Sequence, residues 1–453
     1  MGNKGDIFRN FSGLRLKLKA LSITGLAVAA LLAQDPALAQ TRLNPNAQAQ
    51  IPARNPVTAQ QQSDALPEGM GVLDRARPEY DAAGLVLGAF TLYPSLAAGI
   101  GVDDNIYRVP VATASALFTV SPRLDLRGSW DEDTLQLFGQ LDHYAYADRD
   151  TESRTNWMLG GAGRKDLGPG SFLGGTGSYF DTHETRTSPD LSLLALSPTR
   201  YQRLHADGTI SGQFSVWTLS ASVNVDRFDF DRTALTGGGT LDNGDRNRNA
   251  YQLTGKAAYE VSPGQRLFAQ VTYDRRDFDR LLDRNGVNRS SDGYRLNFGA
   301  ELMLTPVIRA IGYGGWLQQN HAAPLTDTST VDFNLQIDWF VTELFTGHLY
   351  AARLIEDTTN AGASSVDVRR IGASLDYELL REFILQPYLR YDDERFEGIA
   401  RNDRTVSAGL EARYLLNQHV AAYAGYAFEQ RDTNAAGRNF TSNVFTFGLR
   451  GQL

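Results

Sequence analysis

Two adjacent carboxylates and an amide, Asp103, Asp104 and Asn105, lie in the stretch GVDDNIYRVP at residues 101–110. Carboxylate and amide oxygens are calcium ligands, and paired carboxylates also serve in acid–base catalysis. A calcium loop places oxygen ligands at alternating positions over about twelve residues, whereas apolar and aromatic residues interrupt this series. Asp and Asn also hydrogen-bond their own backbone where a strand ends. We therefore interpret the stretch as the outer rim of a strand, with Tyr107 suited to the membrane interface.

The other groups that could do chemistry lack a catalytic spacing. The chain has no Cys, which excludes thiol catalysis, thiolate metal sites and disulfides. Its six histidines form no paired metal or catalytic motif: His143, His183, His205, His321, His348 and His419. A site assembled across strands stays open for His348, near Asp338 and Glu411. We predict no enzymatic activity, cofactor or metal site, and the net charge of −8 argues against nucleic acid as a partner.

The N-terminus has the pattern of an export signal. Basic residues precede the apolar run at 21–32, and the small-x-small motif Ala37-Leu38-Ala39 follows it. This run is too short to span about 30 Å of hydrocarbon, so we predict a signal peptide over 1–39, cleaved near Ala39. Residues 40–83 are rich in Gln, Ala, Asn and Pro and predict a disordered periplasmic segment. A tether or partner-binding arm is the alternative.

From Pro94 onward, apolar residues recur at every second position in segments of about ten residues, the length of a tilted strand that crosses a bilayer. A soluble sandwich or propeller also alternates in this way. Aromatic residues such as Trp217, Tyr251, Trp339 and Tyr414 gather at the ends of the apolar stripes, as in the girdles of membrane barrels. The pattern therefore favours a transmembrane barrel.

The connections between these segments alternate between short and long. Short ones include GQF at 212–214 and TPV at 305–307, and long ones include the stretches at 181–200 and 233–249. Outer-membrane barrels have short periplasmic turns and longer outer loops. We predict an all-β, antiparallel up-and-down barrel over 84–453 with about 18 strands, 16–20 being the range. The alternation continues to the last residue, Leu453, as a closing strand requires.

The polar positions of the strands define a predicted lumen. The charged residues assigned to it are Asp142, Asp226, Lys256, Glu260, Asp274, Arg295, Glu301, Asp332, Asp338, Arg390, Glu411 and Arg413. Rings of one sign select ions, so mixed signs suit neutral polar solutes. Amide, carboxylate and phenol groups also pair with sugar hydroxyls. The alternative is that these residues only keep the lumen wet and rigid.

Three stretches carry a resemblance to a known family. LDRARPEYDAAG at 73–84, GAFTLYPSL at 88–96 and DDNIY at 103–107 make the chain similar to the putative β-barrel porin 2 family of outer-membrane proteins. The resemblance implies an outer-membrane barrel, and it makes Asp103, Asp104, Asn105 and Tyr107 a family marker. Members are often associated with exopolysaccharide biosynthesis and secretion, so the resemblance implies this role too.

These observations predict a function in the bacterial outer membrane. The leading hypothesis is a channel or accessory barrel for exopolysaccharide secretion. A general diffusion porin for small solutes is the alternative, and an outer-membrane polysaccharide hydrolase or lyase comes third. The expected partners are outer-membrane lipid, a polysaccharide or other polar solute in the lumen, the barrel-assembly machinery and periplasmic secretion components.

Overall fold

Strands that follow one another in the sequence pair side by side around a single wall in the computed structural model, which describes residues 71–130 and 133–453. The wall strands are β2 (Phe90–Asp103), β3 (Ser115–Trp130), β4 (Asp133–Tyr146), β5 (Arg154–Gly168), β6 (Ser171–His183), β7 (Arg200–Phe214), β8 (Trp217–Phe230), β11 (Arg248–Ser262), β12 (Gln265–Phe278), β13 (Ser291–Thr305), β14 (Ile308–His321), β15 (Thr328–Thr342), β16 (Phe345–Asp357), β17 (Ser365–Leu380), β18 (Phe383–Phe396), β19 (Asn402–Leu415), β20 (Val420–Thr433) and β21 (Phe440–Gln452). The predicted signal peptide and residues 40–70 lie outside the described residues.

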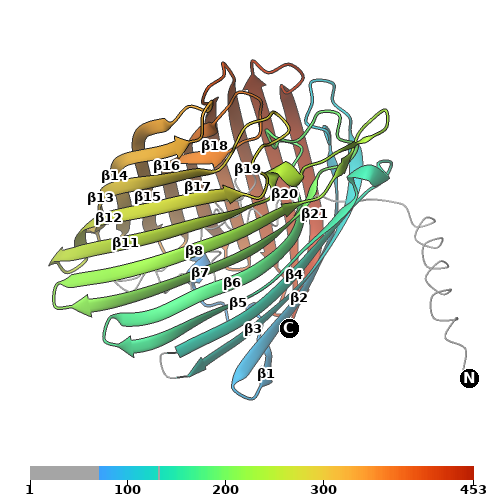
Figure 1. Ribbon diagram of the computed structural model, residues 1–453. Coiled ribbons are helices and arrows are strands. Elements are labelled where there is room, and N and C mark those ends of the chain that lie inside the picture. The colour runs from blue at the N-terminus through green and yellow to red at the C-terminus, as the bar shows by residue number, and fades with distance from the viewer. Residues whose placement is uncertain (1–70, 131–132) are drawn as a thin grey trace, which may run out of the picture.

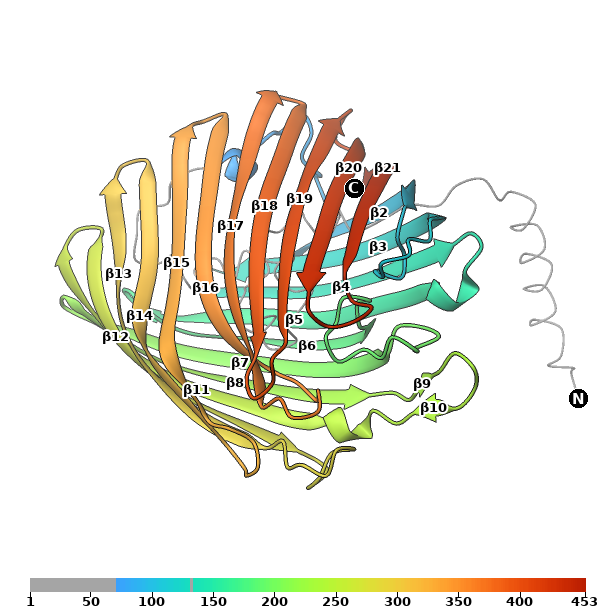
Figure 2. The same ribbon diagram turned by 90° about the horizontal axis from the view of Figure 1, so that it is seen from above.

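The wall closes because its first and last strands pair with each other. β2 runs antiparallel to β21, with Ser95 opposite Gln452 and Asp103 opposite Val444. The result is a closed barrel of 18 antiparallel strands, which confirms the predicted fold and strand number. Figure 1 shows the tilted strands, and Figure 2 shows the wall from above. Within the described ranges, no helix is long and apolar enough to cross a lipid bilayer.

Side chains alternate between the two faces of the wall as the sequence pattern predicts. On β21, Phe445, Phe447 and Leu449 are more than half exposed, whereas Thr446 between them is 7% exposed. The exposed apolar set faces lipid because no other layer of the described residues covers it. Aromatic rings pack along this outer face, such as Trp217 against Tyr259 with ring centroids 5.0 Å apart. The inner face therefore carries the polar residues.

Short turns at one edge of the barrel alternate with longer loops at the other. One short turn differs from its predicted position at 212–214, because β7 continues to Phe214, which pairs with Trp217. The turn lies at residues 215–216, where Ser215 has a φ of 57°, as two-residue hairpins with primed turns require. Short elements complete the chain: β1 (Leu85–Leu87), β9 (Thr233–Ala234), β10 (Thr240–Leu241) and the 3₁₀ turns η3 (Val72–Asp74), η4 (Asp150–Glu152) and η5 (Gly244–Arg246).

Residues 71–83, the last part of the predicted disordered segment, are ordered against the short-turn edge. Val72 is fully buried, and its N–H donates to Oγ1 of Thr346 at 2.9 Å. The guanidinium of Arg77 pairs with Glu378 at 2.5 Å, and both side chains are buried. These residues escape the disorder expected from their composition because the barrel supplies the burial and the ion-pair partner that the segment itself lacks.

The pairing of β21 with its neighbours β20 and β2 requires a glycine at position 448. An added Cβ at Gly448 would lie 2.3 Å from the ring of Tyr423 and 2.5 Å from the carbonyl oxygen of Ala98. We expect Gly448→Val to prevent closure, so the chain should lose its heat-modifiable folded band on gel electrophoresis. Gly255→Val is the control, since no atom lies within 4 Å of its added Cβ. Equal folding of both variants would contradict the prediction.

Candidate functional site: the lumen and its outer cavity

The two adjacent carboxylates of the opening motif point in different directions. Asp103 on the inner face accepts a hydrogen bond from Arg108 at 2.8 Å, and Arg108 also lies 3.6 Å from Glu429. Asp104 instead accepts hydrogen bonds from the backbone N–H and side-chain amide of Asn443. The pair therefore does not converge on one ligand, and in the described part of the chain no group of three or more His, Asp or Glu is placed to hold a metal ion.

The loop after β2 turns into the barrel mouth. Ile106 is buried against Leu117 and Tyr144 on the inner face, and Tyr107 packs against the same cluster with the guanidinium of Arg186 5.4 Å from its ring centroid. Tyr107 therefore does not lie at the membrane interface, which corrects the sequence interpretation. The next residue, Arg108, pairs with the inner carboxylates of Asp103 and Glu429, and the guanidinium of Arg186 from another loop lies over the Tyr107 ring.

The charged residues predicted to line the lumen all lie on inner faces of their strands. Most have partners within the wall: Asp226 with Arg203, Asp274 with Arg276 and Arg295, Glu301 with Lys256 and Arg266, Asp338 with Arg309, Arg390 with Asp392, Glu411 with Arg413, Asp332 with Asn297, and Asp142 with Gln140. Glu260 is half-buried, and its position on β11 is opposite Arg266. The wall thus joins predicted residues in three pairs, Lys256 with Glu301, Asp274 with Arg295, and Glu411 with Arg413.

Other inner-face charges were not predicted, although the same alternation could have found them. Arg203 and Arg370 are about 1% exposed as side chains and pair with Asp226 and Asp392 at 2.6 Å. Both arginines stand on the polar parity of their strands. Strand parity indicates which wall face a residue occupies but not which neighbour it meets.

His348 has a carboxylate at each ring nitrogen, as does His205, which lies between Asp207 and Asp226. The Nδ1 of His348 lies 2.8 Å from Asp338, and its Nε2 lies 3.2 Å from Asp376. Arg309 and Gln336 also donate to Asp338, and Gln386 donates to Asp376. Both ring nitrogens are thus engaged by carboxylates, an arrangement that fixes the ring in the wall rather than presenting it to a nucleophile.

A long loop between β6 and β7 extends into the lumen; we call residues 184–199 the crossing loop. Near its start, Glu184 pairs with Arg246 at 2.5 Å, and Arg186 pairs with buried Glu152. Arg246 belongs to η5 and Glu152 to η4, on either side of the loop's own strands. These two buried ion pairs fix the base of the loop.

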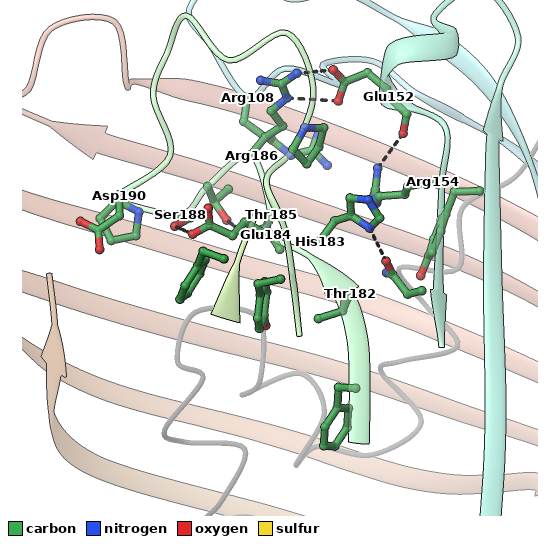
Figure 3. Close-up of a pocket in the computed structure, with 18 of the residues that line it drawn as sticks. Arg108, Glu152, Arg154, Thr182, His183, Glu184, Thr185, Arg186, Ser188 and Asp190 are labelled. Carbon is green, nitrogen blue, oxygen red and sulfur yellow. Dashed lines mark hydrogen bonds and ion pairs between the residues drawn. The ribbon is translucent and has the colours of Figure 1, made fainter. Parts of the chain in front are cut away.

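The far end of the crossing loop reaches the opposite wall. Asp190 accepts hydrogen bonds from the Thr358 hydroxyl at 2.7 Å and the Asn360 amide at 2.8 Å, in the loop between β16 and β17. Arg431 on β20 donates to the Thr187 carbonyl at 2.8 Å. Figure 3 shows residues 182–190 in front of strands from the C-terminal part of the barrel. The loop therefore crosses the outer mouth instead of projecting from it.

A cavity of about 320 Å³ lies beside the crossing loop, inside the outer mouth. Rings from the wall line it, among them Tyr144, Tyr201 and Phe230. Arg154 covers the Tyr144 ring at 4.7 Å, and Arg246 covers the Phe230 ring at 4.0 Å. Figure 3 shows part of this lining, with His183, Glu184 and Arg186 on one segment. The cavity thus combines aromatic surfaces with charged groups that are already paired.

Two buried carboxyl oxygens in this cavity, Oδ1 of Asp142 and Oε1 of Glu356, have no hydrogen-bond partner among the described residues. Glu356 on β16 is 6% exposed, and its Oε1 accepts no hydrogen bond from the described residues. A buried acceptor left without a partner costs about 1–3 kcal/mol, unless a ligand or water satisfies it. The cavity therefore offers a hydrogen-bonding site for a polar solute.

The family model for the putative beta-barrel porin 2 family matches residues 77–453, from the ordered N-terminal segment to the last residue. The chain belongs to this family. Membership confirms the family resemblance and makes this an outer-membrane β-barrel of the porin type. No curated protein matches the chain.

Solved structures share the barrel architecture with this family member at low identity. The siderophore receptor PiuA from Acinetobacter baumannii has a TM-score of 0.44 at 11% identity, covering 81% of this chain and 82% of that chain. OccK2 (OpdF) from Pseudomonas aeruginosa has a TM-score of 0.42 at 11% identity, covering 80% of this chain and 98% of that chain. Likeness at this level gives no information about what the present chain binds.

We predict that acid opens the base of the crossing loop in this porin-family barrel. Burial would raise the pKa of Glu184, but the charge of Arg246 and the hydrogen bonds from Arg246 and Ser188 outweigh it and lower the pKa below the ordinary value of 4.5. A carboxyl whose folded pKa is lowered stabilises the fold above its unfolded pKa and loses that contribution as pH falls. We expect the loop to open below pH 4.5, measured as faster protease cleavage within 184–199. Glu184→Gln should flatten this pH dependence, and an unchanged profile in that variant would contradict the prediction.

Proposed function

We propose that this porin-family barrel is an outer-membrane channel for hydroxyl-rich polar solutes and takes part in exopolysaccharide secretion. The observation that carries the proposal is the outer cavity, where aromatic rings and an unpartnered carboxyl oxygen of Glu356 stand inside the lumen. Sugar rings present apolar faces and hydroxyl edges, and such sites combine aromatic surfaces with a few polar groups. The family's association with exopolysaccharide supports the same class of solute.

The inner wall supports a neutral rather than an ionic solute. In the described part of the wall, many of these charges form pairs of opposite sign, such as Arg203 with Asp226 and Lys256 with Glu301, rather than a ring of one sign. Ion-selective pores use rings of like charge. Paired groups still present hydrogen-bond donors and acceptors along the wall, which favours passage of sugars over small ions or nucleic acid.

The crossing loop supports a selective channel over a general diffusion porin. It is held at its base by Arg246 and at its far end by Thr358 and Asn360, so it narrows the outer mouth. A general porin for small solutes would share the wall and the cavity but would not discriminate between sugars and other solutes of equal size.

The first experiment measures single-channel conductance of the purified full-length protein in planar bilayers. Addition of neutral oligosaccharides should block the current reversibly, with stronger block as the chain lengthens. Glu356→Leu should weaken the block, whereas Glu343→Gln, an exposed residue of a short turn, should not. Open channels without any oligosaccharide block would favour the general porin.

The second experiment tests secretion in the cell. Deleting the gene should lower the yield of secreted polymer or shift its chain length, and the intact gene should restore both. Unchanged polymer in the deletion strain would overturn the secretion part of the proposal. The release of new reducing ends from polymer by the purified barrel would instead indicate a hydrolase or lyase.

A further inference from the structure

The outer edge of strands β16 to β19 has a sharp boundary between apolar and charged rows. Backbone pairing places four outward-facing residues directly beside one another in the last apolar row: Ala351, Ile371, Tyr391 and Val406. Two positions closer to the long loops, the corresponding row is Arg353, Arg369, Asp393 and Arg404. Tyrosine at such a boundary marks the membrane interface, so the charged row stands at the level of lipid headgroups.

Four arginines at this edge stand on the outward face, and three of them are accessible while Arg353 is largely covered. The side chains of Arg369, Arg395 and Arg404 are 38%, 48% and 55% exposed, and that of Arg353 is 14% exposed. All four have the same strand parity as the lipid-facing residues below them, such as Leu349 on β16. They cannot reach the lumen, so the solute path does not account for them. We call Arg353, Arg369, Arg395 and Arg404 the arginine patch.

Cations outnumber anions in this patch. Arg353 and Arg369 are directly opposite each other in the pairing of β16 with β17, and both bond to Asp367, at 2.7 and 3.0 Å. Like charges at directly opposite positions are unfavourable. Asp393 is likewise shared, by Arg395 at 3.0 Å and Arg404 at 3.6 Å. A further outward carboxylate, Asp432, lies opposite Arg404. The row therefore keeps a positive excess.

The other side of the barrel has the opposite balance. Around β6 to β12, outward Arg200, Arg227 and Arg275 stand among more carboxylates, namely Asp181, Asp229, Asp231, Asp277 and Asp279. The same Arg–Asp pairing thus recurs at the same edge, but with an anionic excess. Of these two faces, only the one on β16 to β19 has a cationic surplus, and it would attract an anion at headgroup depth more strongly than the other.

We propose that the arginine patch binds the phosphate of a phosphorylated glycolipid in the outer leaflet. Guanidinium groups bind phosphate in bidentate geometry, and the more exposed arginines of the patch, Arg369, Arg395 and Arg404, are the ones that can reach a phosphate at headgroup level. The apolar row below, with Tyr391 and Ile371, would contact the acyl chains of the same lipid. The anchored lipid would fix one face of the barrel against the membrane, independently of what passes through the lumen.

The test uses the full-length protein in detergent micelles with added lipid A, a diphosphorylated glycolipid, and native mass spectrometry to count bound lipid. The patch variant is Arg369→Gln with Arg404→Gln. The matched control is Arg227→Gln with Arg275→Gln, which removes the same charges from the anionic face. Heat-modifiable mobility on gels confirms that each barrel is folded.

Wild-type and control proteins should retain lipid A, and the patch variant should bind it about tenfold more weakly for each lost guanidinium–phosphate contact. Lipid A from which both phosphates have been removed should bind with the same affinity to the wild type, the control and the patch variant. The proposal would be overturned if the patch variant and the control retained lipid A equally. It would also be overturned if the wild type bound dephosphorylated lipid A as tightly as intact lipid A.

Discussion

Replacing residues 186–197 with a short Gly-Ser linker should raise the single-channel conductance several-fold. The strands that the loop joins stay together without it, because His183 and Arg200 are already paired in the sheet. The linker removes the contacts of Asp190 with the opposite wall and of Arg186 with Glu152. Since conductance follows the narrowest section of a pore, widening the outer mouth should increase both the current and the size limit for sugars.

The control for this replacement is a loop on the same edge that does not cross the mouth. Shortening residues 322–327 between β14 and β15 leaves the anchors of the crossing loop in place. That variant should keep the wild-type conductance. If the linker variant conducts no better than the wild type while the barrel remains folded, the crossing loop is not the constriction.

Arg246→Ala should destabilise the base of the crossing loop and let it open. Arg246 and Glu184 are each about 7% exposed as side chains and make a two-point contact at 2.5 and 2.9 Å. Removing one partner of a buried ion pair leaves the other charge unpaired and costs about 3–5 kcal/mol. Amide hydrogen exchange within residues 184–199 should therefore accelerate strongly, while exchange in the wall strands should remain slow.

A matched control is available on a neighbouring outer loop. Arg280 pairs with Asp242 at 2.7 Å, but both side chains are nearly half exposed, and solvent screens such surface pairs so that they contribute little to stability. Arg280→Ala should leave exchange in the crossing loop almost unchanged. The double variant Glu184→Gln with Arg246→Gln should recover part of the loss, because it buries no unpaired charge. Equal effects of Arg246→Ala and Arg280→Ala would contradict the role assigned to the buried pair.

The wall was predictable because period-two alternation encodes it residue by residue. Trp217, Leu219 and Val223 are exposed on β8 as their pattern predicts, and the alternation of short and long connections led to the correct strand number. The hairpin at Ser215 shows the limit of this signal, since apolar alternation continues to Phe214 and only backbone geometry fixes the turn.

For the interior, the sequence predicts which residues lie on the inner face of the wall, but not which residues they contact. Parity placed Asp226 and Asp338 inside, but their partners Arg203 and Arg309 depend on strand register, which one sequence does not specify. The crossing loop was counted as an ordinary outer loop, because Asp190 meets Thr358 across a separation of 168 residues. Tyr107 was misplaced for the same reason: its neighbour Arg186 arrives from that loop.

The ordered N-terminal segment has a consequence for how the barrel can come apart. Before entering the first wall strand, it reaches back to the final ones: Gln452 donates to the Tyr80 carbonyl at 3.1 Å, Gln418 to the Pro78 carbonyl at 2.6 Å, and Arg77 holds Glu378. The two ends of the wall are thus joined twice, once by the β2–β21 ladder and once by this strip of chain. If the hydrogen bonds between β2 and β21 broke, the contacts of the N-terminal segment would still hold the two ends of the wall together. The barrel can open along this seam only after both sets of contacts have been released.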